Sequence, residues 1–95
     1  MSIFALNTDD NRLREFDDED AVMAACPVED VMAQRWMFFA KDGEPLRPER
    51  SGAGYYLRPW ASCSSCRLEQ VLPFVQSIES TNGLTVEQVA QSLRH

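Results

Sequence analysis

Two cysteines are the residues of this chain whose types and spacing best suit chemistry. Cys63 and Cys66 are separated by two serines and stand at the start of a predicted helix. Thiols at this spacing can form a disulfide, and the dipole and free amides of a helix N-terminus lower the pKa of a cysteine placed there. Arg58 and Arg67 add positive potential. The pair therefore has the features of a thiol redox site or sensor. The interpretation that we favour, however, is that Cys66 points into the core while Cys63 lies near the helix cap, with redox chemistry as the alternative.

Metal binding and other kinds of catalysis have weaker support. A closed zinc site needs four ligands, and the available ones are Cys26, Cys63, Cys66 and His95. The only histidine is the last residue of the sequence, so no Ser-His or Cys-His pair is expected. The acidic runs 9–10 and 17–20 look solvated, whereas a catalytic acid needs a partly desolvated site. We therefore expect no catalytic residue, metal or cofactor, and a protein that is not an enzyme.

Aromatic and arginine side chains concentrate between residues 36 and 60, which hold six of the nine aromatic residues. Aromatic and arginine side chains often dominate the binding energy of protein interfaces. Alternation along a predicted strand at 36–40 exposes apolar side chains on one face unless helices and the N-terminal hairpin cover both. The sequence therefore predicts an interaction surface formed by Trp36, Phe39, Tyr56, Arg58 and Trp60.

The net charge of −6 lies entirely in the first third of the chain. Residues 1–35 carry nine acidic and three basic residues, whereas residues 36–95 carry six of each. This balance disfavours direct nucleic-acid binding, which needs a basic surface against phosphates. It allows a basic protein partner. A weaker alternative is a nucleic-acid mimic in which the acids of 9–20 imitate phosphates, and an acidic surface can also serve solubility alone.

The elements that must position these residues begin with a hairpin and a helix. Apolar or alternating residues at 2–6 and 12–16 flank a cluster of turn formers. Acidic residues then precede an Ala- and Met-rich run, so we expect a helix that Asp17 caps and that ends before Pro27. Residues 28–34 fit either a short helix or a loop.

The middle of the chain predicts an antiparallel meander of three strands. Residues 36–40 give the strongest strand signal, and the Asp-Gly pair that soon follows favours a tight hairpin turn. We expect the partner strand at 44–47 to end at Pro48, because proline interrupts a ladder. A loop then leads to a third strand at 55–58.

Two helices are predicted in the last third of the chain. Residues 66–80 carry an apolar stripe of helical spacing, and Pro73 within it predicts a kink or a split. A serine upstream, Ser62 or Ser64, is the expected cap. Thr85 and Gln88 have the spacing of a capping box, which predicts the start of the second helix.

The predicted order β-β-α-β-β-β-α-α indicates an α+β domain with an antiparallel sheet of about five strands and the helices packed on one face. A length of 95 residues suits a single domain, 1–95. No apolar run approaches the roughly 18 to 20 residues of a membrane span, and the N-terminus lacks the basic start of a secretory signal. We therefore expect a cytoplasmic protein without a membrane partner.

Two motifs resemble those of a group of small bacterial proteins. The first is Trp-x-Phe-Phe-x-x-Asp-Gly-x-Pro-Leu over residues 36–46, and the second is Gly-x-Tyr-Leu-Arg-Pro over residues 54–59. The resemblance covers residues 3–60 and consists of strand and turn residues. The group carries no established activity, so the resemblance assigns no functional residue, and the Cys63/Cys66 pair lies outside it.

The interpretation that these patterns favour is a non-enzymatic interaction or accessory module of a bacterium. It would bind a protein partner, or a second copy of itself as a homodimer, through the aromatic and arginine surface. A thiol redox protein or sensor that uses Cys63 and Cys66 is the alternative, and the nucleic-acid mimic is the weaker third hypothesis.

Overall fold

A six-stranded mixed sheet forms the frame of the molecule, which we describe from a computed structural model over residues 2–60, 67–80 and 83–93. The strands are β1 (Ile3–Asn7), β2 (Arg12–Phe16), β3 (Trp36–Ala40), β4 (Pro45–Ser51), β5 (Gly54–Pro59) and β6 (Ser77–Glu79). Their spatial order is β5-β4-β3-β1-β2-β6. All neighbours are antiparallel except β2 and β6, which run parallel.

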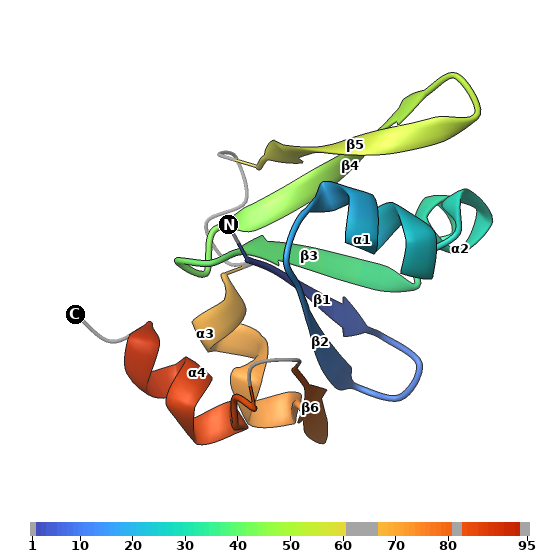
Figure 1. Ribbon diagram of the computed structural model, residues 1–95. Helices are drawn as coiled ribbons and strands as arrows, with labels where there is room; N and C mark the ends of the chain where they lie inside the picture. Colours follow the sequence, from blue (N-terminus) through green and yellow to red (C-terminus); the bar gives the residue numbers. More distant parts are fainter. Residues whose placement is uncertain (1, 61–66, 81–82, 94–95) are drawn as a thin grey trace.

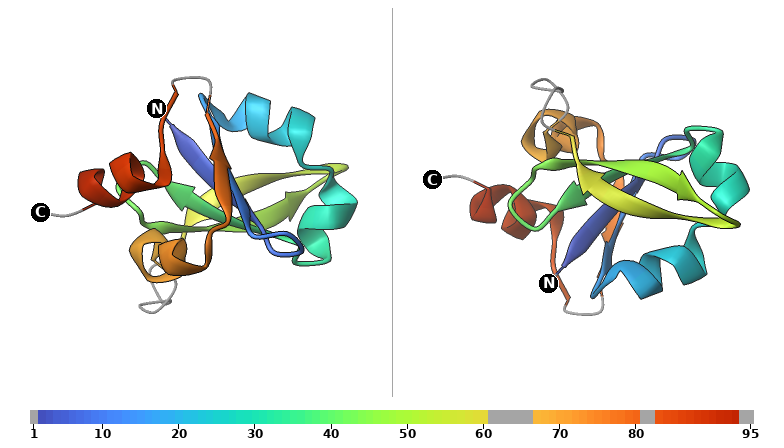
Figure 2. Two further views of the ribbon diagram at one scale, coloured as in Figure 1. Left: turned by 90° about the horizontal axis from the view of Figure 1, so that it is seen from below. Right: turned by 90° about the horizontal axis from the view of Figure 1, so that it is seen from above.

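Short helices cover both faces of this sheet (Figure 1). They are α1 (Glu19–Ala25), α2 (Val28–Met32), α3 (Leu68–Val71) and α4 (Val86–Ser92), with the 3-10 turn η1 (Leu72–Phe74) directly after α3. Figure 2 shows α1 and α2 on one side of the sheet and α3 and α4 on the other. The prediction of an α+β fold is confirmed. The expected antiparallel sheet of about five strands is close to the observed one, which has a sixth strand paired in parallel. The expectation that the helices pack on one face is corrected, because they cover both (Figure 2). No helix in the described ranges is long and apolar enough to cross a membrane.

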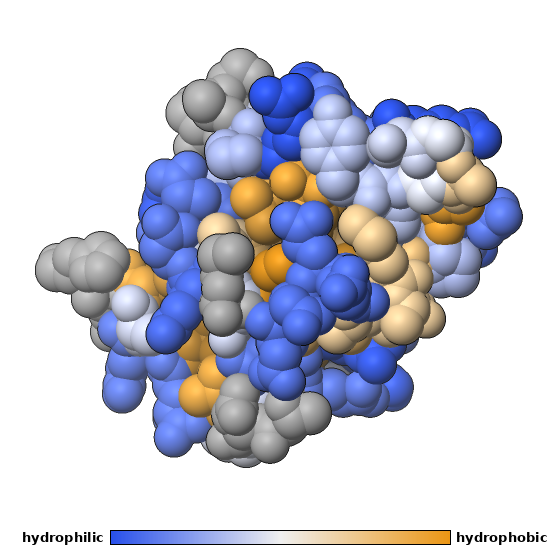
Figure 3. All heavy atoms as spheres, turned by 45° about the horizontal axis from the view of Figure 1, so that its top comes forward, coloured by the Kyte–Doolittle hydropathy of each residue, from blue (hydrophilic) through white to orange (hydrophobic). Residues whose placement is uncertain are grey.

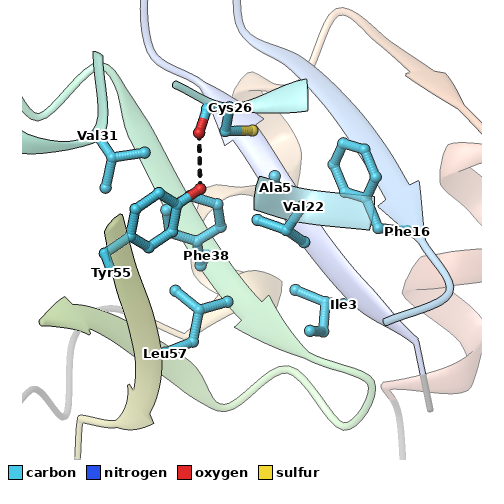
Figure 4. Close-up of a cluster of buried hydrophobic side chains, with 9 residues drawn as sticks. All are labelled: Ile3, Ala5, Phe16, Val22, Cys26, Val31, Phe38, Tyr55 and Leu57. Carbon is cyan, nitrogen blue, oxygen red and sulfur yellow. Dashed lines mark hydrogen bonds between the residues drawn. The ribbon is translucent and has the colours of Figure 1, made fainter. Parts of the chain in front are cut away.

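Two separate cores result from strands that are apolar at nearly every position. Successive side chains of a strand point to opposite faces, so the apolar runs of β1 and β3 need cover on both sides. The α1–α2 core consists of Ile3, Ala5, Phe16, Val22, Cys26, Val31, Phe38, Tyr55 and Leu57 (Figure 4). The α3–α4 core consists of Phe4, Leu6, Leu13, Phe39, Leu68, Leu72, Val89 and Leu93.

On the face that Figure 3 shows, hydrophobic residues gather in the middle and hydrophilic residues surround them.

Within the α1–α2 core, the Tyr55 hydroxyl donates a hydrogen bond of 2.8 Å to the carbonyl of Cys26. This bond satisfies the polar end of a ring that is otherwise buried among apolar side chains, and it ties β5 to the end of α1.

The N-terminal hairpin and its helix form as predicted, with one change at the cap. β1 and β2 pair over all five residues of each strand. Asp18, rather than Asp17, caps α1, because its carboxylate accepts a hydrogen bond of 2.9 Å from the amide of Ala21. The stretch after Pro27, which fitted either a helix or a loop, forms the helix α2.

Strand β4 runs past Pro48, where the sequence predicted its end. It pairs with β5 over six residue pairs and continues to Ser51. The backbone N–H of Trp60 donates to the carbonyl of Pro45 at 2.9 Å. Along an antiparallel ladder, residue pairs that share hydrogen bonds alternate with pairs that do not. Counted from that bond, the backbone nitrogen of Pro48 points away from β5. Its missing N–H therefore leaves the β4–β5 ladder intact.

The helix predicted over 66–80 is wrong beyond its first turns. α3 has only four residues, and Pro73 lies in η1, where its missing amide ends the helical ladder as expected. Arg67, rather than a serine upstream, occupies the N-cap position of α3, and its backbone amide donates to the side chain of Gln70 at 3.2 Å. The chain then extends into β6, and the amide of Gln76 donates to the carbonyl of Asn11 at 2.8 Å. This contact begins the parallel pairing with β2.

Helix α4 confirms the strongest local signal of the sequence. The amide of Gln88 donates to the hydroxyl of Thr85 at 3.1 Å, and the amide of Thr85 donates to the side chain of Gln88 at 2.9 Å. Both halves of the capping box are thus formed. Val89 and Leu93 of this segment are buried in the α3–α4 core.

The turn between β3 and β4 is held against α3 by an arginine. The Arg67 guanidinium donates to the carboxylates of Glu44 at 2.8 Å and Glu69 at 2.9 Å, and these hydrogen bonds raise the pKa of Arg67. Gly43 sits in this turn with φ of +89°, and a Cβ there would lie 3.0 Å from both Glu69 and Leu93. The close approach of turn and helix therefore requires glycine at this position.

Candidate interaction groove

Strands β3 and β4 are joined at only one end, which opens a seam between them. Two residue pairs connect residues 38–39 with residues 45–46. Next to them, Ala40 donates its N–H to the carbonyl of Glu44 at 2.8 Å. By the alternation of an antiparallel ladder, the even-numbered residues of β3 therefore direct their backbone groups toward β4.

Pro48 explains where this pairing stops. In the same register it lies opposite Trp36, where another residue would donate its amide to the Trp36 carbonyl. Proline has no amide hydrogen, so this ladder bond cannot form. Beyond that point β4 remains with β5 and diverges from β3 (Figure 1).

The seam opens into a groove of about 580 Å³, which we call the β3–β4 groove. Its described lining comes from β3, β4, α2 and the residue that follows β5, and most of it is apolar. The apolar side chains that are not fully buried include Met32, Trp36, Met37, Leu46, Pro48 and Trp60. The volume falls within the range of roughly 300–1,000 Å³ that is typical of ligand-binding pockets.

One end of the groove is closed by the turn between β1 and β2. Thr8 donates its amide to the carbonyl of Arg35 at 2.9 Å and its hydroxyl to the same carbonyl at 3.1 Å. Gln34, which also lines the groove, has a positive φ of 63°, and this left-handed residue turns the chain from α2 into β3. The groove wall is therefore built from segments that hydrogen bonds hold together.

A polar cluster adjoins the groove on the outer face of β4 and β5. The Glu49 carboxylate accepts hydrogen bonds from Arg47 at 2.8 Å, from the Tyr56 hydroxyl at 2.7 Å and from Arg58 at 3.2 Å. The bond from Tyr56, followed by that from Arg58, lowers the pKa of Glu49. Arg47 also lines the groove, so the cluster reaches the groove through this residue, and Glu49 orients the guanidinium groups of both Arg47 and Arg58.

The structure places the sequence-predicted interaction residues in three different environments. Trp36 and Trp60 both line the groove, and Trp60 is 37% exposed. Tyr56 and Arg58 are exposed in the adjoining polar cluster. Phe39 also lines the groove, but its side chain is fully buried in the α3–α4 core, so the exposed surface proposed below leaves it out.

Several groove residues were missed in the sequence. Met32, Met37 and Pro48 carry much of the apolar lining, yet each has an ordinary strand or helix role in the sequence pattern. The useful signal was a proline inside a run that otherwise reads as a strand. Such a residue indicates that one side of the strand is unpaired at that point.

The cysteines divide between the described and the undescribed parts of the chain. Cys26 is fully buried, and burial raises the pKa of its thiol to about 11. Cys63, Cys66 and His95 lie outside the described residues, so the redox hypothesis stays a prediction. Within the described ranges, no three His, Cys, Asp or Glu side chains are grouped as a metal ion would require.

The acidic residues of the first third serve several separate local roles. Asp18 caps α1, and the Asp10 carboxylate accepts a hydrogen bond of 3.0 Å from the amide of Arg12. Glu15 is buried and accepts a hydrogen bond from Ser80. Three of the acids in 9–20 are thus used for helix capping, turn formation and internal bonding, and the nucleic-acid-mimic hypothesis stays a prediction.

No protein-family model, no curated protein and no solved structure matches this chain in sequence or fold.

Proposed function

We propose that this protein is a non-enzymatic interaction module that binds a segment of a partner protein in the β3–β4 groove. The observation that carries the proposal is the groove itself, an apolar cavity of about 580 Å³ at an incompletely paired seam of the sheet. Trp60 and Met32 at its walls are each 37% exposed. Exposed apolar and aromatic side chains around a concave site are typical of binding surfaces.

The chemistry of the groove supports binding rather than catalysis. Its described lining contains no His, Cys, Asp or Glu. The hydroxyl of Thr8 is the closest to a nucleophile, but it donates to a backbone carbonyl and has no general base in the lining to activate it. The described part of the lining can therefore exclude water and hold apolar groups, and it supplies no group for acid–base or nucleophilic chemistry.

The charge beside the groove indicates what the partner segment carries. Arg47 and Arg58 together with Glu49 give the polar cluster beside the groove a net charge of +1, in a chain whose net charge is −6. A complementary segment would place apolar side chains in the groove and a carboxylate beside the two arginines. The acidic first third of the chain would orient a partner that is basic elsewhere.

Tagged protein can test this proposal by affinity capture and quantitative mass spectrometry of three forms. We expect wild-type protein to retain a partner that Trp60→Glu loses, because the substitution places a charge in the apolar groove. Phe74→Glu is the matched control, since Phe74 on η1 is 67% exposed and lies outside the groove lining. It should retain the partner.

Intrinsic fluorescence gives the direct readout. The two tryptophans of the chain both line the groove, so adding the purified partner should shift their emission. Capture of the same proteins by Trp60→Glu and wild type, or tryptophan emission that is unchanged at saturating partner, would rule the groove out as the binding site. Melting curves of all three forms establish that each is folded.

A further inference from the structure

Strand β5 forms a free edge of the sheet on the side away from the groove. It stands at one end of the strand order. The hydrogen bond from Trp60 to Pro45 sets the alternation of the β4–β5 ladder, so Tyr56 and Arg58 bond to β4 through their backbone groups. Tyr55 and Leu57 therefore direct their N–H and C=O groups outward. No described residue accepts a hydrogen bond from either of these two amides.

This edge lacks most of the features that keep sheet edges apart. β5 has six residues, whereas β6 at the opposite edge has three. Natural edge strands are commonly protected by lysines, inward-pointing charges, bulges or prolines. β5 contains no lysine or acidic residue, and Pro59 protects only its end. Among the described residues nothing accepts a hydrogen bond from the outward amides of Tyr55 and Leu57, so another strand can pair with them.

We infer that β5 pairs antiparallel with β5 of a second copy of this chain, which joins two sheets about a two-fold axis. Two registers place outward groups opposite one another. In the first, Tyr55 of each copy pairs with Leu57 of the other, and all the outward groups of these two residues are satisfied. In the second, Leu57 pairs with its own counterpart, and the Tyr55 carbonyl faces Pro59, which has no N–H to donate. Tyr56 then lies opposite either the second copy's Tyr56 or its Arg58.

The charge of β5 favours a second copy as the occupant. β5 brings no carboxylate to the contact, and its one charge, Arg58, is bonded to Glu49 of the same chain. Pairing of two copies along β5 therefore places no carboxylate of one paired strand against a carboxylate of the other. The pairing goes beyond the proposed groove function, because it leaves both β3–β4 grooves open and makes the module bivalent.

Sedimentation velocity over a range of concentrations tests the inference. Wild-type protein should approach the mass of two chains as concentration rises. Tyr56→Lys should weaken self-association about ten-fold or more, because the new ammonium faces either its own counterpart or Arg58 in the two possible registers. Met23→Lys makes the same charge change at a residue of α1 that is similarly exposed, 37% against 38%. It should dimerise like wild type.

Amide hydrogen exchange identifies the surface. At dimer-forming concentration the amides of Tyr55 and Leu57 should be protected in wild type and exchange rapidly in Tyr56→Lys, while the amide of Arg58 stays protected in both. A wild-type monomer at several hundred micromolar would overturn the inference. So would equal dissociation of the two lysine variants, or a dimer in which Tyr55 and Leu57 exchange rapidly.

Discussion

The two halves of the sheet differ in how firmly they are held. β1 pairs with both β2 and β3 over five residue pairs each, and helices cover this part on both faces. The β4–β5 hairpin is joined to β3 by two pairs and rests on a helix through the Tyr55 face alone. The opposite face of the hairpin carries the Glu49 cluster and is polar. The groove lies where these two differently built halves meet.

This difference shows how a small domain can combine stability with a binding site. The central strands β1 and β3 have apolar residues on both faces, and all of these except Trp36, Met37 and Ala40 of β3 are buried. The hairpin alternates between apolar and polar residues and contains Pro48, which ends its pairing with β3. A site at the seam can therefore expose tryptophan without exposing either core.

The largest expected effect comes from the enclosed half. Phe39→Ala should lower the free energy of unfolding by about 3–5 kcal/mol, because it removes a fully buried ring from the α3–α4 core. Trp60→Ala in the groove should lower it by less than about 1 kcal/mol, since Trp60 is partly exposed. Urea denaturation of both variants measures the contrast. Equal losses would show that the groove wall is part of the folding core.

The turn that connects the two halves should be the next most sensitive point. Gly43→Ala combines an unfavourable positive φ with close contacts to Glu69 and Leu93, and we expect a loss of about 2 kcal/mol or more. Gly52→Ala is the control, because Gly52 also has a positive φ of 59° but no atom lies within 4 Å of the added carbon. The difference in urea midpoint between the two variants measures the cost of crowding the contact between the turn and the helix. Equal midpoints would show that this contact is not tight.

Closing the seam should have a smaller effect on stability. Pro48→Val supplies an amide that can bond to the carbonyl of Trp36, worth about 1 kcal/mol, while the loss of proline rigidity offsets about 0.4–1 kcal/mol. We expect little change in stability, slow exchange of the new amide at position 48, and weaker partner binding in the groove. Pro45→Val, whose new amide would face β5, should leave the seam open. Rapid exchange at position 48 would show that β4 cannot reach β3.

A still smaller effect concerns the polar face of the hairpin. Tyr56→Phe removes the hydrogen bond that contributes most to the lowered pKa of Glu49, so this pKa should rise toward its ordinary value. A carboxylate with a lowered pKa stabilises the fold above its ordinary pKa, and this stabilisation is lost as pH falls through the lowered value. Carboxyl carbon NMR titration measures the shift. Tyr55→Phe should leave the pKa of Glu49 unchanged.

The buried thiol of Cys26 should show almost no reaction with an alkylating reagent. At neutral pH Cys26 should resist iodoacetamide in the folded protein and react in urea, because it is buried and its pKa is about 11. The pKa of Cys26 is higher in the folded protein than in the unfolded chain, so the protonated thiol favours the folded state. This contribution to stability is fully present below the ordinary thiol pKa and is lost as pH rises toward 11. Labelling in folded protein therefore reports on Cys63 and Cys66 alone.

The same labelling experiment tests the redox hypothesis. A lowered thiol pKa, or a Cys63–Cys66 disulfide at cytosolic potentials, would support it. Two ordinary reduced thiols would exclude it. Mass spectrometry with and without reductant distinguishes these outcomes.

The elements that the sequence predicted correctly are those with local signals. Thr85 and Gln88 define the start of α4, and Pro27 ends α1, because caps and proline act within a few residues. β6 could not be predicted in this way. It pairs with residues 12–14, far away in the sequence, and the apolar spacing around Ile78 fits a helix equally well.

The groove was only partly predictable for a related reason. Composition identified Trp36 and Trp60, since aromatic residues near arginines are uncommon outside interfaces and cores. The meaning of Pro48 depends on which neighbour its nitrogen faces, and that follows from the register of two ladders rather than from the residue itself. Phe39 was placed on the interaction surface because single-strand alternation does not show that helices cover both faces.

The division into two cores also sets an order of events during synthesis. Every residue of the α1–α2 core lies between positions 3 and 57, whereas the α3–α4 core needs four residues from positions 68–93. A chain leaves the ribosome N-terminus first, so one side of the sheet can close while the other still lacks its helices. Until those helices emerge, the nascent chain presents Phe4, Leu6, Leu13 and Phe39 as an open apolar surface that a chaperone can hold.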